Sequence, residues 1–397
     1  MARGWYMAAA GGDGRAMLTG IRVLDLTSVV FGPYATQILH DLGAEVLKIE
    51  APETGDVARW LGAPAKTPGM SPTFFSLNGG KRSAVLNLKD AADLATMQRL
   101  VSECDVLVLN VRGKALQRLG LDFASAQRLN PGIVYVHCVG FGQAGPYADE
   151  PAYDDVIQAA TGATSLASRV DGDPRARYIP SLIADKVSGL HAAYAALAAI
   201  VHKLRTGEGQ YVEVPMFEAF AQFNLVEHLG GLAFDPPNAP PCYARQVDPN
   251  RQPFPASDGF IAIVPYTEQA WPKLLEALGA GDIAQNPRFA TREMRIANVT
   301  QLYALLAMLT VNHTCAELLV ICRGLDLPAR TARDIADIRE DPHLASTGFF
   351  TRREHPSEGA YLEMKQPVEF GQWPARPRGL PPGLGEHRAE FSPSEDR

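Results

Sequence analysis

Several features are missing from this sequence of 397 residues. Its five cysteines form no C-x-x-C pair, and an odd number of widely spaced cysteines is typical of a reducing, cytoplasmic location. We expect each to be a small buried residue rather than a ligand. The most apolar stretch, 189–201, is too short to cross a bilayer, so no membrane partner is expected.

An excess of basic charge is also missing. The formal net charge is −7 and the isoelectric point is near 5.8, which argues against a nucleic-acid partner because phosphates need a basic face. A local basic pocket for a small anion is still compatible with this charge. The length favours two domains, and a composition of 46% hydrophobic and 20% charged residues is that of a globular protein.

Common catalytic motifs are absent as well. The turn after the first expected strand reads TSVVFGPY and lacks G-x-G-x-x-G, which argues against a nicotinamide enzyme. There is no Walker loop and no G-x-S-x-G elbow. The nine histidines show no H-E-x-x-H spacing, so no metal site is expected. No prosthetic group is expected either.

Alternating strands and helices fill the N-terminal half. The pattern predicts a strand at 21–27, a helix at 34–43 and a strand at 44–50, which together make a βαβ unit. It continues with a strand at 105–110, a helix at 113–121 and a strand at 133–140. Strands with little polar alternation indicate a parallel sheet covered on both faces.

A long helix at 183–206 follows, with Gly207 as its expected C-terminal cap. Beyond the proline-rich 236–241, a strand at 259–265 and helices at 267–279 and 297–320 predict a smaller α+β unit, and the chain is expected to be loop-rich from about 346. We therefore predict six segments: a disordered extension (1–18), the first part of a large domain (19–206), a linker (207–241), a small domain (242–328), a return segment completing the large domain (329–390) and a tail (391–397).

Several stretches, taken in order, resemble the class III CoA-transferases, the group that includes formyl-CoA transferase, carnitine CoA-transferase and α-methylacyl-CoA racemase. The main ones are VLDLTSVVFGPYATQILHDLGAEVLKIE, NGGKRSAVLNLK, CVGFGQAGPYADEPAYDDVIQAATG, SLIADKVSGLHAAYAALAAIVHKLRTGEGQYVEVPMFEA, SDGFIAI, DPHLASTGFF and LGEH. They span about residues 20 to 387. The resemblance implies an α/β fold with a Rossmann-like large domain, a smaller inserted α+β domain, and an interlocked homodimer whose active site lies between domains of different chains.

Asp185 stands at the start of the long helix, and on spacing alone an N-terminal cap is its commoner role. The resemblance reverses that interpretation, because Asp185 within IADKVSG matches the family's catalytic aspartate. A carboxylate can attack a thioester to give an anhydride and CoA thiolate, and then an aspartyl-CoA thioester. This implies a CoA transferase that uses an acyl-CoA and a free carboxylic acid. A short dicarboxylic acid such as succinate is a candidate donor or acceptor.

Two alternatives stay open: an acyl-CoA racemase or isomerase, and a CoA-binding paralogue without turnover. The racemase branch has a histidine where this chain has Tyr153, and tyrosine is a poor base at neutral pH. Tyr153 therefore favours a transferase, and the adjacent Asp154 matches an acidic substrate-site position. A core aromatic with a bonded hydroxyl is the alternative role for Tyr153.

By resemblance to formyl-CoA transferase, six residues match positions that contact CoA: Leu86, Lys89, Asn110, Val111, Arg118 and Leu119. The arginines of YARQVDPNRQPF, Arg245 and Arg251, could hold the far carboxylate of a dicarboxylic acid. The chain departs from formyl-CoA transferase at Ala51, at Val30 and in lacking a glycine-rich loop near 245–256, which argues against oxalate and formate.

Overall fold

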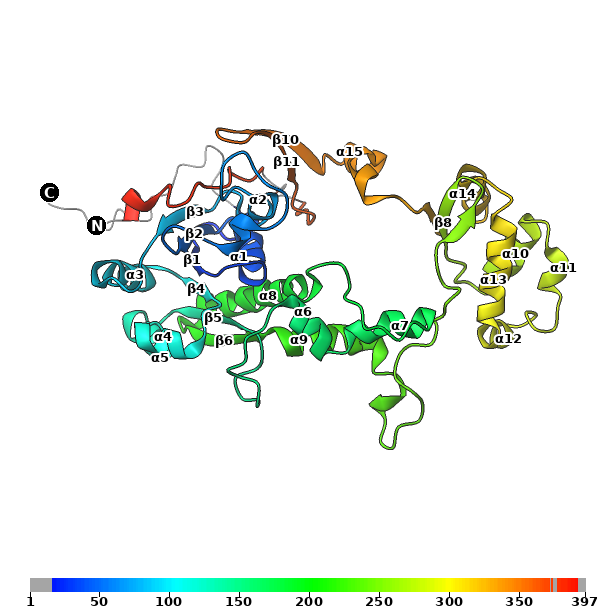
Figure 1. Cartoon of the computed structure of the whole chain (residues 1–397), viewed down its shortest axis with the longest axis horizontal. Coiled ribbons are helices and arrows are strands. Elements are labelled where there is room, and N and C mark those ends of the chain that lie inside the picture. Colours follow the sequence, from blue (N-terminus) through cyan, green and yellow to red (C-terminus); the bar gives the residue numbers. More distant parts are fainter. Residues whose placement is uncertain (1–15, 372, 374–376, 392–397) are drawn as a thin grey trace. The chain divides into compact units, whose positions relative to one another are not determined.

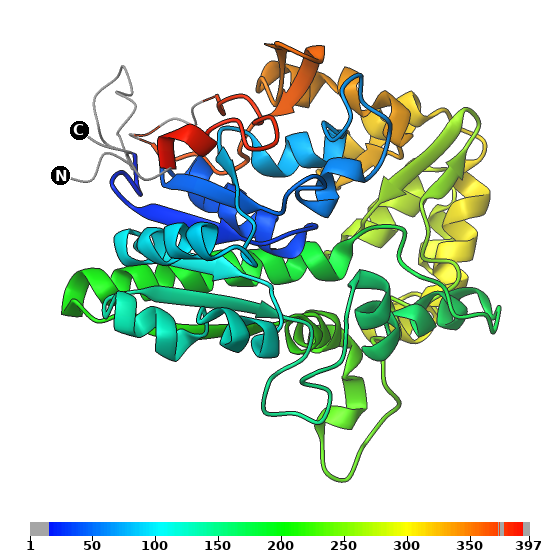
Figure 2. The ribbon, with the colours of Figure 1, turned by 60° about the vertical axis from the view of Figure 1, so that its left-hand side comes forward.

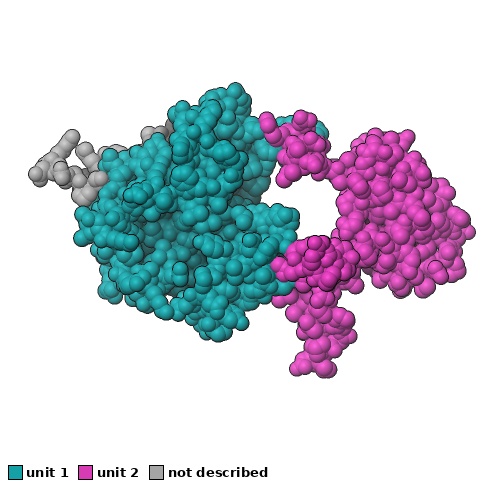
Figure 3. All heavy atoms as spheres, viewed as in Figure 1, with its two compact units in different colours: residues 1–163, 178–224, 342–397 teal, residues 164–177, 225–341 magenta. Residues whose placement is uncertain are grey.

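The computed structural model describes residues 16–371, 373 and 377–391, which form two compact units (Figure 3). Of these residues, the first unit contains 16–163, 178–224 and those described between 342 and 391, and the second contains 164–177 and 225–341. Most of the expected extension and tail lie outside the described residues. Leu18 does not belong to a disordered extension, because it is buried in the core of the first unit.

A six-stranded parallel sheet organises the first unit (Figure 1), in the order β3-β2-β1-β4-β5-β6. Its strands are β1 (Arg22–Leu26), β2 (Glu45–Glu50), β3 (Arg82–Val85), β4 (Val106–Leu109), β5 (Val134–Val139) and β6 (Gln210–Pro215). The longer helices are α1 (Phe31–Asp41), α3 (Ala91–Glu103), α8 (Ile183–Thr206) and α9 (Met216–His228). Shorter ones are α2 (Pro72–Asn78), α4 (Gly113–Leu119), α5 (Phe123–Leu129) and α6 (Asp154–Ala160). The predicted α/β class with a parallel sheet is confirmed.

Successive residues of the central strands pack on opposite faces of this sheet. Val106 and Val108 join a core with α1 and α8, whereas Leu107 and Leu109 join a second core with α3, α4 and α5. Every residue of β5 is buried. Apolar side chains on both faces explain why these strands show little polar alternation in the sequence.

Helix α8 has the predicted bounds and ends at Gly207, which adopts the left-handed conformation at φ 79°. It is long and apolar enough to cross a membrane by composition alone. Buried alanines such as Ala192, Ala193 and Ala196 instead place one side of α8 in the first core, against α1 and β5. Its apolar character is therefore explained by its position in the core.

Three predicted segments differ from the structure. The expected linker 207–241 contains β6 and α9, and its residues 207–224 belong to the first unit. The expected helix 297–320 is two helices, α13 (Val299–Thr310) and α14 (Cys315–Gly324), because Thr314 forms a capping box that starts the second. The expected loop region after 346 contains an antiparallel hairpin of β10 (Phe350–His355) and β11 (Gly359–Met364).

The second unit has an antiparallel sheet in the order β7-β8-β9. Its strands are β7 (Phe254–Ala256), β8 (Gly259–Ile263) and β9 (Ala329–Thr331), packed with α10 (Ala270–Ala277), α13 and α14. It also contains α7 (Leu166–Asp171), α11 (Gly281–Ala284) and α12 (Arg292–Ala297). Because β9 pairs with β8, the expected return segment at 329–390 starts too early, and its first residues complete the small sheet.

Residues 377–391 belong to the first unit. The short helix η5 (Arg388–Phe391) lies beside β3 (Figure 2), and His387 donates its backbone N–H to the Ser83 carbonyl. Arg378 pairs with the Asp41 carboxylate of α1. Four cysteines are buried as expected, but Cys242 is only half-buried.

Candidate active site

Asp185 lies in the first turn of α8, as the third helical residue. The residue in the cap position is Leu182, which makes no side-chain cap hydrogen bond. The capping role that spacing alone favours for Asp185 is therefore wrong. Only 5% of Asp185 is exposed, so its carboxyl group is an acid held inside the protein and not a solvated surface charge.

The start of α1 faces this carboxyl group. The backbone N–H of Phe31, the first residue of α1, lies close to the Asp185 carboxyl group and favours its charged form. An added Cβ at Gly189 would lie 2.9 Å from both the Phe31 carbonyl oxygen and Tyr34 Cδ1. Only glycine at 189 permits this approach of α8 to α1. Two helix N-termini, both favourable to negative charge, therefore meet at Asp185.

Asp154, at the start of α6, lies next to Asp185 and is also buried. Its carboxylate accepts the backbone N–H of Asp185 at 3.1 Å and the Gln158 side-chain amide at 2.5 Å. The Gln158 amide also reaches the Ser181 carbonyl, which ties α6 to the segment preceding α8. Both Asp154 oxygens thus have protein partners, and its expected role in substrate binding stays a prediction.

Burial raises the pKa of Asp185 to about 7, with the negative charge of Asp154 as a second cause. The Phe31 N–H acts in the opposite direction and stabilises the ionised form. Both protonation states are therefore populated near neutral pH. A buried carboxyl group with such a pKa is a frequent property of catalytic sites.

The residues expected to contact CoA all belong to the first unit. Lys89 and Arg118 are exposed, whereas Leu86 is buried in the second core, with Val111 and Leu119 packed against it. Asn110 uses its whole side-chain amide on Ser28: Oδ1 accepts the Ser28 N–H at 3.2 Å and Nδ2 donates to the Ser28 carbonyl at 2.9 Å. The amide of Asn110 thus serves the fold, and CoA contacts at all six positions stay predictions.

Tyr153 is 65% exposed, so the alternative of a buried core aromatic is wrong. Arg245 and Arg251 belong to the second unit. Arg245 donates to the hydroxyl groups of Tyr303 at 2.9 Å and Tyr266 at 3.1 Å, and its guanidinium lies over the Tyr266 ring. These contacts hold Arg245 within its own unit, and carboxylate binding by either arginine stays a prediction.

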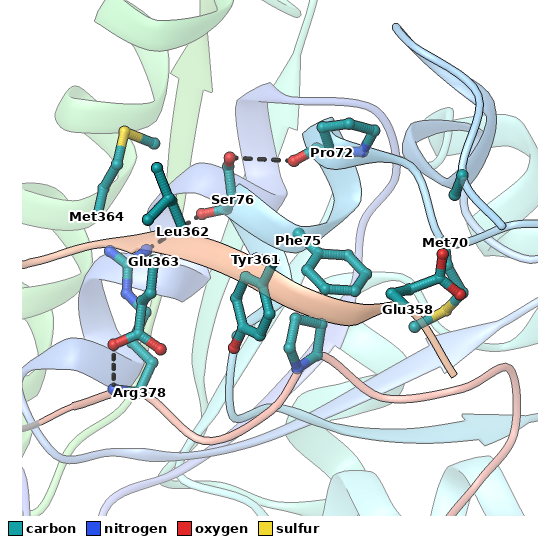
Figure 4. A pocket seen from close by; sticks show the side chains of 13 residues that line it. Met70, Pro72, Phe75, Ser76, Glu358, Tyr361, Leu362, Glu363, Met364 and Arg378 are labelled. Atoms are coloured by element: carbon teal, nitrogen blue, oxygen red, sulfur yellow. Dashed lines mark hydrogen bonds between the residues drawn. The ribbon is translucent and has the colours of Figure 1, made fainter. Parts of the chain in front are cut away.

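A cavity of about 270 Å³ in the first unit lies between α2 and β11, remote in sequence from Asp185 (Figure 4). Phe75 and Tyr361 form part of its wall, and Glu363 is held there by the backbone N–H of Arg378. Sequence reasoning gave no signal for it, because β11 was expected to be loop. Among residues 16–371, 373 and 377–391, no group of three His, Cys, Asp or Glu side chains could hold a metal ion.

Comparison with known proteins gives consistent results. Residues 18–388 match the family described as CoA-transferase family III. A succinate–glutarate CoA-transferase of Agrobacterium fabrum is 32% identical over 381 residues, covering 94% of each chain. A formyl-CoA:oxalate CoA-transferase of Escherichia coli O157:H7 is 31% identical over 406 residues, with 94% of each chain covered. The crystal structure of a CAIB/BAIF family protein from Brucella suis has a TM-score of 0.81 and 30% identity, covering 95% of this chain and 98% of that one.

Proposed function

Because the chain belongs to CoA-transferase family III and is a CoA-transferase enzyme, we propose that Asp185 is the nucleophile that carries the acyl group and CoA in turn. The buried carboxyl group of Asp185, facing the Phe31 N–H, is the observation that carries this proposal. The resemblance of IADKVSG to the catalytic segment of the family agrees with it.

The proposed reaction is a series of acyl exchanges without oxidation or reduction. An Asp185 oxygen attacks the thioester carbonyl carbon, the C–S bond breaks, and CoA leaves as thiolate. The thiolate attacks the Asp185 carbonyl carbon of the resulting anhydride and releases the donor carboxylate. The acceptor carboxylate then attacks this aspartyl-CoA thioester and expels the thiolate. In the last step the thiolate attacks the acceptor acyl carbon, which regenerates the Asp185 carboxylate.

The surroundings of Asp185 suit both halves of this sequence. The ionised form is needed for attack, and it becomes the major form as the pH rises through about 7. When the Asp185 carbonyl carbon is itself attacked, the Phe31 N–H can donate to the oxygen that gains negative charge. Burial also limits access of water, which would otherwise hydrolyse the anhydride.

We propose short dicarboxylic acids, in the size range of succinate and glutarate, as substrates. The similarity to the succinate–glutarate enzyme supports this class, and so does a second arginine, Arg251, near the expected substrate loop. Val30 and Ala51 differ from the formyl-CoA transferase pattern and argue against oxalate and formate. For CoA, the proposed contacts are the basic Lys89 and Arg118 with apolar neighbours Leu86, Val111 and Leu119.

The rest of the family arrangement is proposed on the same resemblance. It comprises an interlocked homodimer, a cytoplasmic location, and an inserted small domain between two parts of the large one. The active site would then lie between domains of different chains. Sedimentation at micromolar concentration tests the dimer, and a monomer would contradict it.

Oxygen-18 transfer tests the chemistry directly. The enzyme is incubated with succinyl-CoA and with glutarate labelled with ¹⁸O in its carboxylates. The masses of the peptides that contain Asp185 are then measured by mass spectrometry. We expect ¹⁸O in the Asp185 carboxyl group and a CoA adduct on the same residue after rapid quenching. Asp185→Ala should show neither while remaining folded. Transfer that persists in this variant would refute the role of Asp185, and absence of any exchange across a screen of mono- and dicarboxylates would favour the non-catalytic paralogue.

A further inference from the structure

The turn that leads from β1 into α1 contains an unusual backbone conformation. Val29 has φ 75°, in the left-handed region that β-branched residues rarely adopt. Val30 follows it, and the next residue is Phe31, whose N–H lies close to Asp185 and favours its charged form. The direction of this N–H therefore depends on how the strained turn is held.

Two side chains hold the turn from different elements. Asp56 Oδ1, just after β2, accepts the Val29 N–H at 2.8 Å and the Ser28 hydroxyl at 2.9 Å. Asn110, just after β4, accepts a hydrogen bond from the Ser28 N–H and donates one to the Ser28 carbonyl oxygen. The backbone of the turn is thus fixed on both sides of the Ser28–Val29 peptide.

A chain of buried charges fixes Asp56 in turn. Lys48 on β2 lies 2.7 Å from Asp56 and 3.8 Å from Asp25, and Lys81 lies 3.1 Å from Asp25. All four side chains are fully buried. Two lysines balance two aspartates, so Asp56 keeps its charge without contact with water. Burying these four charges costs desolvation energy. We interpret this cost by the need to hold the strained Val29 turn.

We infer that Asp56 and Asn110 are positioning residues, which hold the strained Val29 turn so that the Phe31 N–H points at Asp185. This inference rests on the proposed function. It also changes the role expected for Asn110 from contact with CoA to support of the nucleophile. Neither residue needs to touch the reacting atoms for this role.

The test measures the ionisation of Asp185, because loss of the Phe31 N–H should destabilise its charged form. The other charged group facing Asp185 is Asp154 on α6, which the variants leave unchanged. Lys186, on the same helix as Asp185, donates a hydrogen bond to the Ser181 hydroxyl group. Tyr34 of α1 packs against Gly189. Among the described residues, no hydrogen bond or ion pair joins Lys186 or Tyr34 to Asp56 or Asn110. We therefore expect the variants to act on Asp185 through the turn.

Asn110→Ala is the main variant, since Asp56→Asn leaves Lys48 with a weakened partner and risks misfolding. Ser28→Ala, which removes the hydroxyl bond to Asp56, is the second variant. We expect the acid limb of the pH profile of kcat to move up by about one unit in Asn110→Ala, which is about the effect of one hydrogen bond to a carboxylate. Activity should largely recover at pH 9, and KM for the acyl-CoA should stay within about twofold of the wild-type value.

A role in binding CoA or in general stability predicts a different result. A raised KM for the acyl-CoA, or reduced activity at every pH, with an unmoved acid limb would overturn the inference. Carboxyl ¹³C resonances of Asp-labelled protein, assigned with Asp185→Asn, report the same ionisation without turnover. If the wild-type protein transfers no CoA, the proposed function is refuted. The positioning role is refuted separately, by an unchanged titration of Asp185 in both folded variants.

Discussion

The Asp154 carboxylate accepts the backbone N–H of Asp185 at 3.1 Å, which places two buried acids side by side. Asp154 thereby provides the partner that a capping side chain would give to the first turn of α8. Its second oxygen is held by Gln158. The Asp185 carboxyl group is therefore free to face α1, while the nearby negative charge helps to raise its pKa.

The first prediction concerns Asp154→Asn. The asparagine oxygen can still accept the Asp185 N–H, but the negative charge is lost, so the pKa of Asp185 should fall below about 7. The acid limb of the kcat profile should then move to lower pH. Asp155→Asn is the matched control, because Asp155 is the exposed neighbour on the same helix. An unmoved acid limb in Asp154→Asn would show that the two acids are not coupled.

The second prediction is that Asp185→Asn stabilises the fold at neutral pH. The pKa of Asp185 is about 7 in the folded state and 3.8 is its ordinary value, so the folded protein binds more protons between these values. Wild-type stability therefore falls as the pH rises from about 4 to 7. Removing the ionisable group should raise the free energy of unfolding above pH 7 by on the order of 2–4 kcal/mol at most.

Urea unfolding of both proteins at pH 8 and pH 4 measures this effect. The difference between wild type and Asp185→Asn should be largest at pH 8 and nearly absent at pH 4. Equal differences at both pH values would mean that ionisation of Asp185 does not oppose folding.

The third prediction concerns the contact between α8 and α1. In Gly189→Ala the new methyl group would lie 2.9 Å from the Phe31 carbonyl oxygen, so α1 must shift. We expect a loss of about 1–3 kcal/mol in stability and a roughly tenfold to hundredfold loss in kcat. Gly324→Ala is the control, since no atom lies within 4 Å of its added Cβ. Full activity in a folded Gly189→Ala protein would show that catalysis does not depend on the contact between α8 and α1.

The sequence predicts those strands and helices that depend mainly on the pattern of neighbouring residues. A short apolar run predicts the strand at 21–27, and the helical period of the apolar residues predicts the helix at 183–206, whose end glycine marks. β6, QYVEVP, gives no clear strand pattern in the sequence, because it is a half-exposed edge strand with mixed residues. The apolar pattern also does not show the break before α14, because that break depends on a capping box at Thr314.

The candidate site shows the same division. Asp185 was identified by resemblance, since an acid near a helix start is usually a cap. Its partners are distant in sequence: Phe31 lies on another helix and Asp154 on a third. The support of the turn by Asp56 and Asn110 had no local signal, because each side chain bonds backbone groups from a separate strand–helix connection.

The fourth prediction tests the substrate class. Arg251→Gln should raise KM for succinate and glutarate about tenfold or more, because the distal carboxylate loses its charged partner. KM for butyrate, which has no distal carboxylate, should change little. Arg288→Gln is the control, being an exposed arginine of the same unit. An equal change in KM for mono- and dicarboxylates in Arg251→Gln would exclude a role of Arg251 in binding the distal carboxylate.

The last prediction separates transfer from racemisation at the acyl α-carbon. Tyr153 is largely exposed, and a phenol is a poor base near pH 7. Glu218 already accepts the Gly142 N–H at 3.0 Å, and His191 Nδ1 contacts the Val187 carbonyl oxygen at 2.9 Å. A chiral 2-methylacyl-CoA incubated in heavy water should therefore keep its α-proton and configuration, while its acyl group still exchanges onto an added acid. Tyr153→Phe should behave in the same way, because no proton transfer depends on its hydroxyl group. Deuterium incorporation that requires Asp185 would instead establish the racemase reaction.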